Sequence, residues 1–504
     1  MSDEEGAWLA PPAPVDAARP SAIPAAARAF LARAFDRVLC GVAALLAGSL
    51  VVAGWHDVSY AYDVWYYHLP FAARLAGIMD ANAYAFSTDN QARYEGFPLF
   101  GELLQGWLWR ITGHVQATSF VSLGALFVLP FFLRRLFGVP IHLALLAFLA
   151  IPLVHIHATS SYVDLPANAC ATLLLLGVYR SYVANEPPAP RVLAGYGVLA
   201  AVTVNTKFQL VPIVVVASAA LLVVSLRDLV GWKTATDTVR SGLKQRLVVF
   251  AVALPIVFAT PIKNAAIHGN PVWPIELRVL GHSFPHAEEA YASSPRHLAG
   301  SPSPVRFVRS VLEIDNRPIT TQHRWSLDQW TPPDEPGYRM GGFFGAYVVL
   351  NLAALGLAVW RRRSREATVA VALFGGATLV ASVVPQSHEL RYYLFWMLLL
   401  VSLNLVLWAR AAPSVVGLAA TASLVIVTWS TSGAYLYASG STFAELLVEK
   451  VDPSVIESAL PHERLCIERQ PFTFLYAPTF HPRKDFSVQE AASEADCRGA
   501  RRFR

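Results

Sequence analysis

Charge is scarce in this chain of 504 residues: 15 % of the residues are Asp, Glu, Lys or Arg, whereas 55 % are hydrophobic. A soluble domain carries about a quarter charged residues, because its surface faces water. So few charges do not cover the surface of a soluble chain of this length, and the mean hydropathy of +0.42 agrees with this. The composition therefore excludes a soluble protein and predicts one that exposes much of its surface to lipid.

The chain also lacks a strong excess of charge of one sign. The 40 Lys and Arg residues stand against 35 Asp and Glu residues, which gives a net charge of +5. No basic stretch is interleaved with aromatic residues, as a nucleic-acid groove requires. Nucleic acid is therefore excluded as a partner, and membrane lipids are the expected surroundings.

Cysteine is scarce too, with four residues, and no spacing of Cys or His resembles a zinc site. Cys40 and Cys170 lie in hydrophobic runs, where a free thiol acts as a small apolar group. Cys466 and Cys497 lie in the C-terminal tail, where an oxidising compartment would permit a disulfide. The sequence leaves this pairing open. It gives no cofactor with certainty, and a divalent metal is left open without support.

Hydrophobic residues come in uncharged runs, several of which exceed the roughly 18 residues that mark a membrane-spanning helix. The runs cover residues 38–56, 111–133, 136–163, 165–179, 192–206, 208–226, 247–262, 340–360, 367–388, 392–409 and 411–444. We therefore predict an all-α polytopic membrane protein with about eleven transmembrane helices.

Basic residues beside short loops orient these helices, because Lys and Arg in such loops stay on the cytoplasmic side. A cytoplasmic N-terminus places the short basic connections inside, for example Arg361, Arg362 and Arg363 after the eighth run. The connections left outside are poor in basic residues or long enough to be exempt from the rule. The prediction is thus an N-terminus inside and a C-terminus outside.

The hydrophobic runs also divide the chain. We expect a disordered cytoplasmic N-terminus over residues 1–36, a transmembrane domain over 37–432 with outer loops at 57–110 and 263–339, and a small periplasmic segment over 433–504. Within the first outer loop, the apolar spacing of residues 65–78 and 98–110 predicts two helices that lie in the membrane interface.

Polar residues gather at the outer ends of the predicted helices, where they are costly and function is the usual reason for keeping them. They are Asp63, Asp164, Lys207, Lys263, Asn264, Asn270, His388, Glu389 and Arg391. Three of them, Lys207, Lys263 and Arg391, are basic on the side that disfavours Lys and Arg. We therefore expect them to frame one cavity.

The same residues also have purely structural interpretations. Asp63 and Asp164 stand where a carboxylate accepts the free amides at the start of a helix. The three basic side chains can extend to lipid headgroups. His68 and His388 are of a type that is more often hydrogen-bonded structure than a ligand. The residues by themselves leave both interpretations open.

In order and topology, these motifs resemble a known family. A Tyr-Asp-x-x-x-Tyr-His-Leu-Pro motif at Asp63 opens the first outer loop, followed by Tyr-Val-Asp-Leu-Pro at Asp164, Lys-Phe at Lys207, Gly-Asn-Pro-Val-Trp-Pro at Asn270 and Arg-Tyr-Tyr at Arg391. The arrangement spans about residues 38–410 and resembles the GT-C superfamily of membrane glycosyltransferases, near the bacterial family 39 and protein mannosyltransferase-like enzymes.

The resemblance implies transfer of a sugar from a polyprenyl-phosphate-linked donor to an acceptor hydroxyl on the outer face, with inversion. Asp63 would be the catalytic base. Many relatives carry a pair of acidic residues where this chain has one, so Asp57 or Asp164 is a possible second carboxylate. Lys207, Lys263, His388 and Arg391 would bind the donor phosphate, and Tyr67, His68, Asn264, Asn270 and Glu389 would line the substrate cavity.

A transporter or flippase for a lipid-linked or anionic substrate is the alternative. It predicts ionisable groups at mid-membrane and broken helices related by internal symmetry. The uncharged runs contain no such groups, and the sequence shows no convincing internal repeat. The preponderance of Arg over Lys is typical of a GC-rich genome and favours a bacterial inner membrane. The acceptor would then be an envelope glycan, a lipid or a protein.

Overall fold

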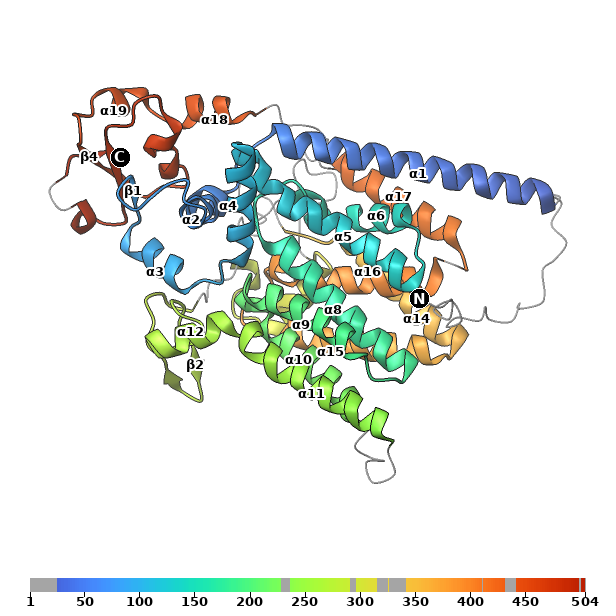
Figure 1. Cartoon of the computed structure of the whole chain (residues 1–504). Coiled ribbons are helices and arrows are strands. Elements are labelled where there is room, and N and C mark those ends of the chain that lie inside the picture. Colours follow the sequence, from blue (N-terminus) through green and yellow to red (C-terminus); the bar gives the residue numbers. More distant parts are fainter. Residues whose placement is uncertain are drawn as a thin grey trace.

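A computed structural model describes residues 25–227, 236–290, 296–314, 325, 341–409, 411–430, 441–497 and 500–503 of the chain. The long helices form one bundle, with α1 (Ala25–His56) along one side of it (Figure 1). At one end of the bundle, the helices of the first outer loop lie together with the C-terminal segment (Figure 1). Parts of two predicted segments lie outside the described residues. They are residues 1–24 of the N-terminus and most of residues 315–340 in the second outer loop.

Each hydrophobic run forms helix over most of its described residues. Besides α1, the helices of the bundle are α5 (Phe120–Phe137), α6 (Ile141–Leu149), α7 (Pro152–His157), α8 (Asp164–Ala184), α9 (Pro190–Val204), α10 (Val211–Leu226), α11 (Asp237–Val257), α12 (Ala259–His268), α14 (Gly345–Arg362), α15 (Arg365–Val383), α16 (Leu394–Trp408) and α17 (Pro413–Ser430). Among the described residues, five spans are long and apolar enough to cross a membrane, and α11 with α12, bent by 53°, makes a sixth. The chain is thus a mostly helical, polytopic membrane protein, and the number of about eleven spans stays a prediction.

Two details of the predicted helices were wrong. The run 136–163 is no single helix: α6 ends at Leu149 and α7 begins at Pro152, because proline has no amide hydrogen to continue the helix. The predicted disorder up to residue 36 was also wrong from Ala25 onward, where α1 begins. The Ala-rich sequence there favours helix, since alanine has the highest helix propensity.

Two helices, α8 and α16, lie at the centre of the bundle. Residues on all sides of both helices are buried, and the two helices pack against each other. A helix that is apolar all round is stable when neighbours cover every face. Both begin at the same end of the bundle, and the first turns there carry Asp164 on α8 and, just before α16, Arg391 on the short helix η7 (Leu390–Tyr393).

The first outer loop folds around its own helices. Its helices are the π-helix η2 (Val64–His68), α2 (Leu69–Leu75), α3 (Thr88–Gly96), α4 (Phe100–Thr112) and the 3-10 helix η3 (Val115–Ser119). The first predicted stretch corresponds to η2 and α2, and the second corresponds to α4. The helices predicted over 65–78 and 98–110 are therefore present, and their position in the membrane interface stays a prediction. Gly106 of α4 lies so close to α2 that an added Cβ would stand 2.3 Å from the Ala72 carbonyl oxygen.

A four-stranded parallel sheet corrects the all-α prediction. Its order is β1-β5-β4-β6, from β1 (Tyr84–Ala85), β5 (Ser487–Ala491), β4 (Arg464–Glu468) and β6 (Arg502–Phe503). The first strand comes from the first outer loop and the others from the tail, with Tyr84 opposite Val488. The short helices of the tail include α18 (Phe443–Lys450), α19 (Pro453–Glu457), η8 (Thr473–Tyr476) and η10 (Glu494–Cys497).

The tail and the first outer loop share one hydrophobic core. Trp65 and Phe71 of the loop pack in it with Leu446, Leu465 and Phe474 of the tail. A segment of about 60 residues buries little apolar surface unaided, and the shared core supplies what it lacks. Cys466 and Cys497 form a disulfide within the tail. The sequence alone had left this pairing open.

The second outer loop, as far as it is described, adds a small hairpin of β2 (Arg278–Val279) and β3 (His282–Ser283) and the helix α13 (Ser303–Val311).

Candidate active site

Asp63 and Arg391 form an ion pair where the first outer loop meets the bundle. Arg391 Nη1 lies 3.0 Å from Asp63 Oδ2. Asp63 immediately precedes η2, and Arg391 lies in η7. The Arg391 side chain is 6 % exposed and that of Asp63 is 20 % exposed, so the carboxylate is the more accessible partner.

A second ion pair, between Lys207 and Asp164, lies beside the first. Asp164 is the first residue of α8 and is fully buried, and Lys207 precedes the short helix η4 (Phe208–Leu210). The Lys207 ammonium lies 4.4 Å from the centre of the Tyr392 ring, and the Arg391 guanidinium lies 5.0 Å from the centre of the same ring. Tyr392 therefore joins the two pairs through cation–π contacts.

The backbone around Arg391 is fixed by a residue that sequence reasoning missed. Asn168, one turn into α8, accepts a hydrogen bond from the Phe395 amide through Oδ1 (2.9 Å) and donates through Nδ2 to the Arg391 carbonyl oxygen (3.4 Å). It is completely buried. An amide inside an otherwise apolar helix was the signal that would have found it, since polar groups are kept there for a purpose.

Glu389 and His388 precede Arg391 in the chain and are almost completely buried. Glu389 Oε2 is 3.9 Å from Arg391 Nε, and Glu389 Oε1 is 3.6 Å from His388 Nε2. Burial lowers the pKa of His388 to about 4, and the charges of Arg306 and His297 lower it too. His388 is therefore neutral at neutral pH, so any contribution to phosphate binding is that of a hydrogen-bond donor and not of a charge.

Tyr67 and His68 lie on η2, next to Asp63. Burial raises the pKa of the Tyr67 phenol well above its usual value, and Asp63 raises it further. The phenol therefore keeps its proton beside the two ion pairs. His68 Nδ1 lies 2.7 Å from Glu102 Oε1 of α4, with both side chains buried. This contact ties η2 to α4 and thereby fixes the segment that carries Asp63.

Three of the predicted site residues bind backbone carbonyls instead of joining the ion pairs: Lys263, Asn264 and Asn270. Lys263 donates to the carbonyl of Glu95 at the end of α3. Asn264 donates to the Gly96 carbonyl (2.7 Å), and Asn270 donates to the carbonyls of Ile275 and Pro285 (both 2.8 Å). These contacts hold the second outer loop together and against the first. They do not join the two ion pairs, so the structure brings together fewer of the polar motifs than we predicted.

Asp57, the other possible second carboxylate, lies at the end of α1. Its Oδ1 is 2.9 Å from Nδ1 of the neighbouring His56. The structure thus brings Asp164, and not Asp57, to the second ion pair. Within the described part of the chain, no group of three His, Cys, Asp or Glu side chains is arranged to hold a metal ion.

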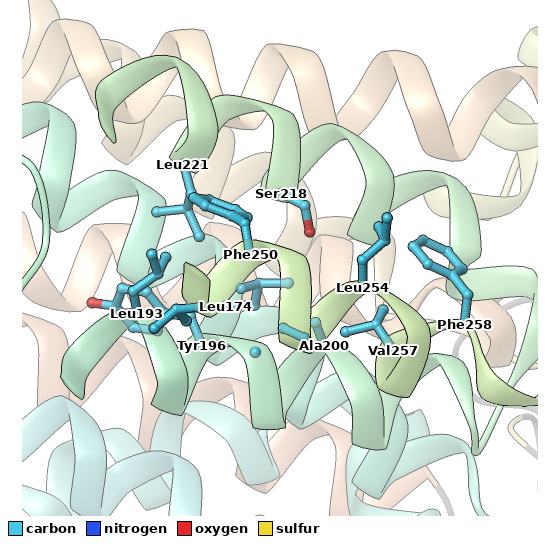
Figure 2. Close-up of a pocket in the computed structure, with 13 residues that line it drawn as sticks. Leu174, Leu193, Tyr196, Ala200, Ser218, Leu221, Phe250, Leu254, Val257 and Phe258 are labelled. Atoms are coloured by element: carbon cyan, nitrogen blue, oxygen red, sulfur yellow. The ribbon is translucent and has the colours of Figure 1, made fainter. Parts of the chain in front are cut away.

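A small apolar groove lies between α8, α9, α10 and α11 (Figure 2). Its walls include Leu174, Tyr196, Leu221, Phe250 and Phe258. Beyond its Val257 end, Asn205 donates to the carbonyls of Ile256 (3.0 Å) and Val257 (3.1 Å). Lys207 follows Asn205 by two residues, so this end of the groove is close in sequence to the second ion pair.

The helical bundle, with the two ion pairs at one end, defines the chain as a polytopic membrane protein. Among the solved structures that it resembles are two of ArnT from Cupriavidus metallidurans. The crystal structure of ArnT in the apo state matches with a TM-score of 0.51 and 12 % identity over 93 % of this chain and 88 % of that chain. The structure of ArnT bound to undecaprenyl phosphate matches with a TM-score of 0.50 and 14 % identity over 92 % of this chain and 87 % of that chain.

At such identities, the likeness concerns the fold. The resemblance to the GT-C superfamily that the sequence motifs suggested is confirmed at this level. The sequence matches no family model and no curated protein.

Proposed function

We propose that this protein is an inverting glycosyltransferase of the bacterial inner membrane. It moves a sugar from a polyprenyl-phosphate-linked donor to an acceptor hydroxyl on the periplasmic face. The observation that carries the proposal is the Asp63–Arg391 pair, a partly exposed carboxylate held against a buried cation. The fold shared with ArnT, one structure of which is bound to undecaprenyl phosphate, supports a lipid-linked donor.

Asp63 is the catalytic base of this mechanism. Its side chain is 20 % exposed, whereas those of Asp164 and Glu389 are 0 % and 1 % exposed, so an acceptor reaches Asp63 most readily. Asp63 takes the proton of the acceptor hydroxyl while the acceptor oxygen attacks the anomeric carbon. Attack comes from the face opposite the phosphate, which inverts the configuration at this carbon.

The bond between the anomeric carbon and the phosphate oxygen breaks, and its electron pair leaves with the lipid phosphate. Phosphate is already a good leaving group, so no acid has to protonate it. Arg391 and Lys207 supply fixed positive charge for the departing phosphate in a site that is mostly closed to water. Tyr67 and His388 are neutral groups that can donate hydrogen bonds to it.

Asp164 has a positioning role. It is fully buried and paired with Lys207, so it holds the ammonium in place beside Tyr392. The apolar groove between α8, α9, α10 and α11 offers a surface of the chemistry that an isoprenoid chain requires.

The decisive experiment is Asp63→Asn in purified, membrane-inserted protein given labelled polyprenyl-phosphate sugars and an envelope extract as acceptor. Loss of a general base lowers transfer by roughly 100-fold to 10,000-fold. Asp89→Asn is the matched control, because Asp89 of the same loop pairs with Arg469 at the same distance of 3.0 Å. Full transfer by a folded Asp63→Asn protein would overturn the proposal, as would transport of the labelled lipid without any transfer.

A further inference from the structure

The base and the binding site of the leaving phosphate share one guanidinium. We infer that Arg391 is an exchange point: it holds Asp63 before the donor arrives, and the donor phosphate displaces the Asp63 carboxylate from it. Donor binding would then release the base, and the donor would bind before the acceptor. This inference rests on the proposed function and adds an order of events to it.

The surroundings of Arg391 leave Asp63 as the partner that moves. Glu389 lies 3.9 Å from Arg391 Nε on the buried side. The rings of Tyr162 and Tyr392 lie 5.3 Å and 5.0 Å from the guanidinium carbon, and Asn168 fixes the backbone. The guanidinium is thus contacted by buried groups, whereas Asp63, with 20 % of its side chain exposed, is a far more exposed partner than Glu389 with 1 %. An incoming phosphate therefore meets Nη1, the atom that Asp63 contacts.

The charges of the cluster favour an exchange. Three carboxylates, those of Asp63, Asp164 and Glu389, face the two cations Lys207 and Arg391. A phosphate of negative charge finds no surplus of positive charge among these described groups, so it binds by taking a cation from a carboxylate. Asp164 is completely buried and has no room to turn toward solvent, which leaves the pair of Asp63 and Arg391 as the one that opens.

The exchange also explains how one carboxylate serves at the right moment. While Asp63 Oδ2 accepts from Arg391, this oxygen faces the guanidinium and not an acceptor hydroxyl. After the phosphate takes this position, the same oxygen is free to accept the proton of the acceptor. Activation of the base is then tied to the presence of the donor, which limits side reactions in its absence.

The test measures the affinity of the purified protein for sugar-free polyprenyl phosphate in nanodiscs, with wild type, Asp63→Asn, Arg391→Gln and the double variant. Removal of the competing carboxylate is expected to tighten binding by roughly tenfold, the effect of one partly buried charge pair. Arg391→Gln is expected to weaken binding, and Asp63→Asn is expected to have no further effect in that background. Asp89→Asn, which breaks a more exposed pair of the same length that does not involve Arg391, is expected to leave affinity unchanged.

A folded Asp63→Asn protein with unchanged or weaker affinity for polyprenyl phosphate would overturn the exchange. A tightening of equal size in the Arg391→Gln background would overturn it too, because the gain would not come through Arg391. The proposed function fails separately: it falls if Asp63→Asn retains transfer, whatever its affinity for the lipid phosphate.

Discussion

The carboxyl group of Glu490 lies between β5 of the tail and α3 of the first outer loop, and its ionisation is expected to weaken the contact between them. Glu490 is 2 % exposed. Asn90 Nδ2 donates to Glu490 Oε1 (2.8 Å), and the Ser87 amide donates to Oε2 (3.3 Å). Burial raises the pKa of Glu490 to about 7, although hydrogen bonds from Asn90 and Ser87 oppose the rise. The perturbation is Glu490→Gln.

The magnitude follows from the pKa of the folded and unfolded states. The ordinary value is 4.5, so the folded protein binds the proton more tightly than the unfolded chain does. The resulting stability is fully present below pH 4.5 and is lost as the pH rises through about 7. Since one pKa unit corresponds to about 1.4 kcal/mol, the loss reaches about 3 kcal/mol above pH 7. Glutamine keeps the acceptor for Asn90 but not the one for Ser87, so we expect Glu490→Gln to recover roughly 1–2 kcal/mol of this.

Hydrogen exchange of the β4 and β5 amides in nanodiscs measures this contact. In wild type, protection is expected to fall between pH 5 and pH 8 after correction for the intrinsic exchange rate, and in Glu490→Gln it is expected to stay nearly constant. Glu468→Gln is the control, because Glu468 lies on β4 of the same sheet and pairs with Arg502 nearer the surface. An equal fall of protection in Glu490→Gln and wild type would refute the argument.

Three further outcomes follow from the ion pairs and the disulfide. Lys207→Met leaves the buried Asp164 without its cation and is expected to cost about 3–5 kcal/mol of stability, measured as the unfolding temperature; adding Asp164→Asn should restore stability but not transfer. The Cys466–Cys497 disulfide closes a loop with a sequence separation of 31, and its reduction is expected to lower the stability of the tail by about 4 kcal/mol. Reductant should have no effect on a protein in which both cysteines are replaced by serine. Glu102→Gln keeps an acceptor for its histidine partner and should retain most transfer, whereas Glu102→Leu should lower turnover without weakening donor affinity, read as a lower kcat with no rise in KM.

The helices could be predicted because their signal is local and strong. An uncharged run long enough to span a membrane is unusual in any other kind of protein, and each run forms helix in the structure. The break between α6 and α7 also has a local cause, the proline at position 152. We missed it because hydropathy measures only how apolar a residue is, and proline breaks a helix through its missing amide hydrogen.

The sheet could not be predicted in the same way. β1 has two residues, too few for the alternation of polar and apolar side chains that marks a strand. Its partner β5 lies about 400 positions away along the chain, where Val488 stands opposite Tyr84. A contact between such distant segments leaves no periodic trace in either of them.

The candidate site divides along the same line. Basic residues on the side that disfavours them pointed to Lys207 and Arg391, both of which the structure places in ion pairs. The same reasoning also selected Lys263, which donates to a backbone carbonyl instead. Position relative to the membrane is a property of a segment, whereas the partner of a side chain depends on the packing of other segments.

The two ion-paired residues Asp63 and Arg391 stand on parts of the protein with different sources of stability. Arg391 lies in η7, just before the central helix α16, and is fixed by α8 through Asn168. Asp63 precedes η2, which is held by the core shared with the tail and by Asn90, whose side-chain amide donates both to the Tyr66 carbonyl (3.2 Å) and to Glu490. A perturbation of the tail is thus expected to change the position of Asp63 and to leave that of Arg391 unchanged. Its effect on the proposed reaction is a loss of turnover without a loss of affinity for the lipid phosphate: if Asp63 moves away from Arg391, the exchange predicts tighter and not weaker phosphate binding.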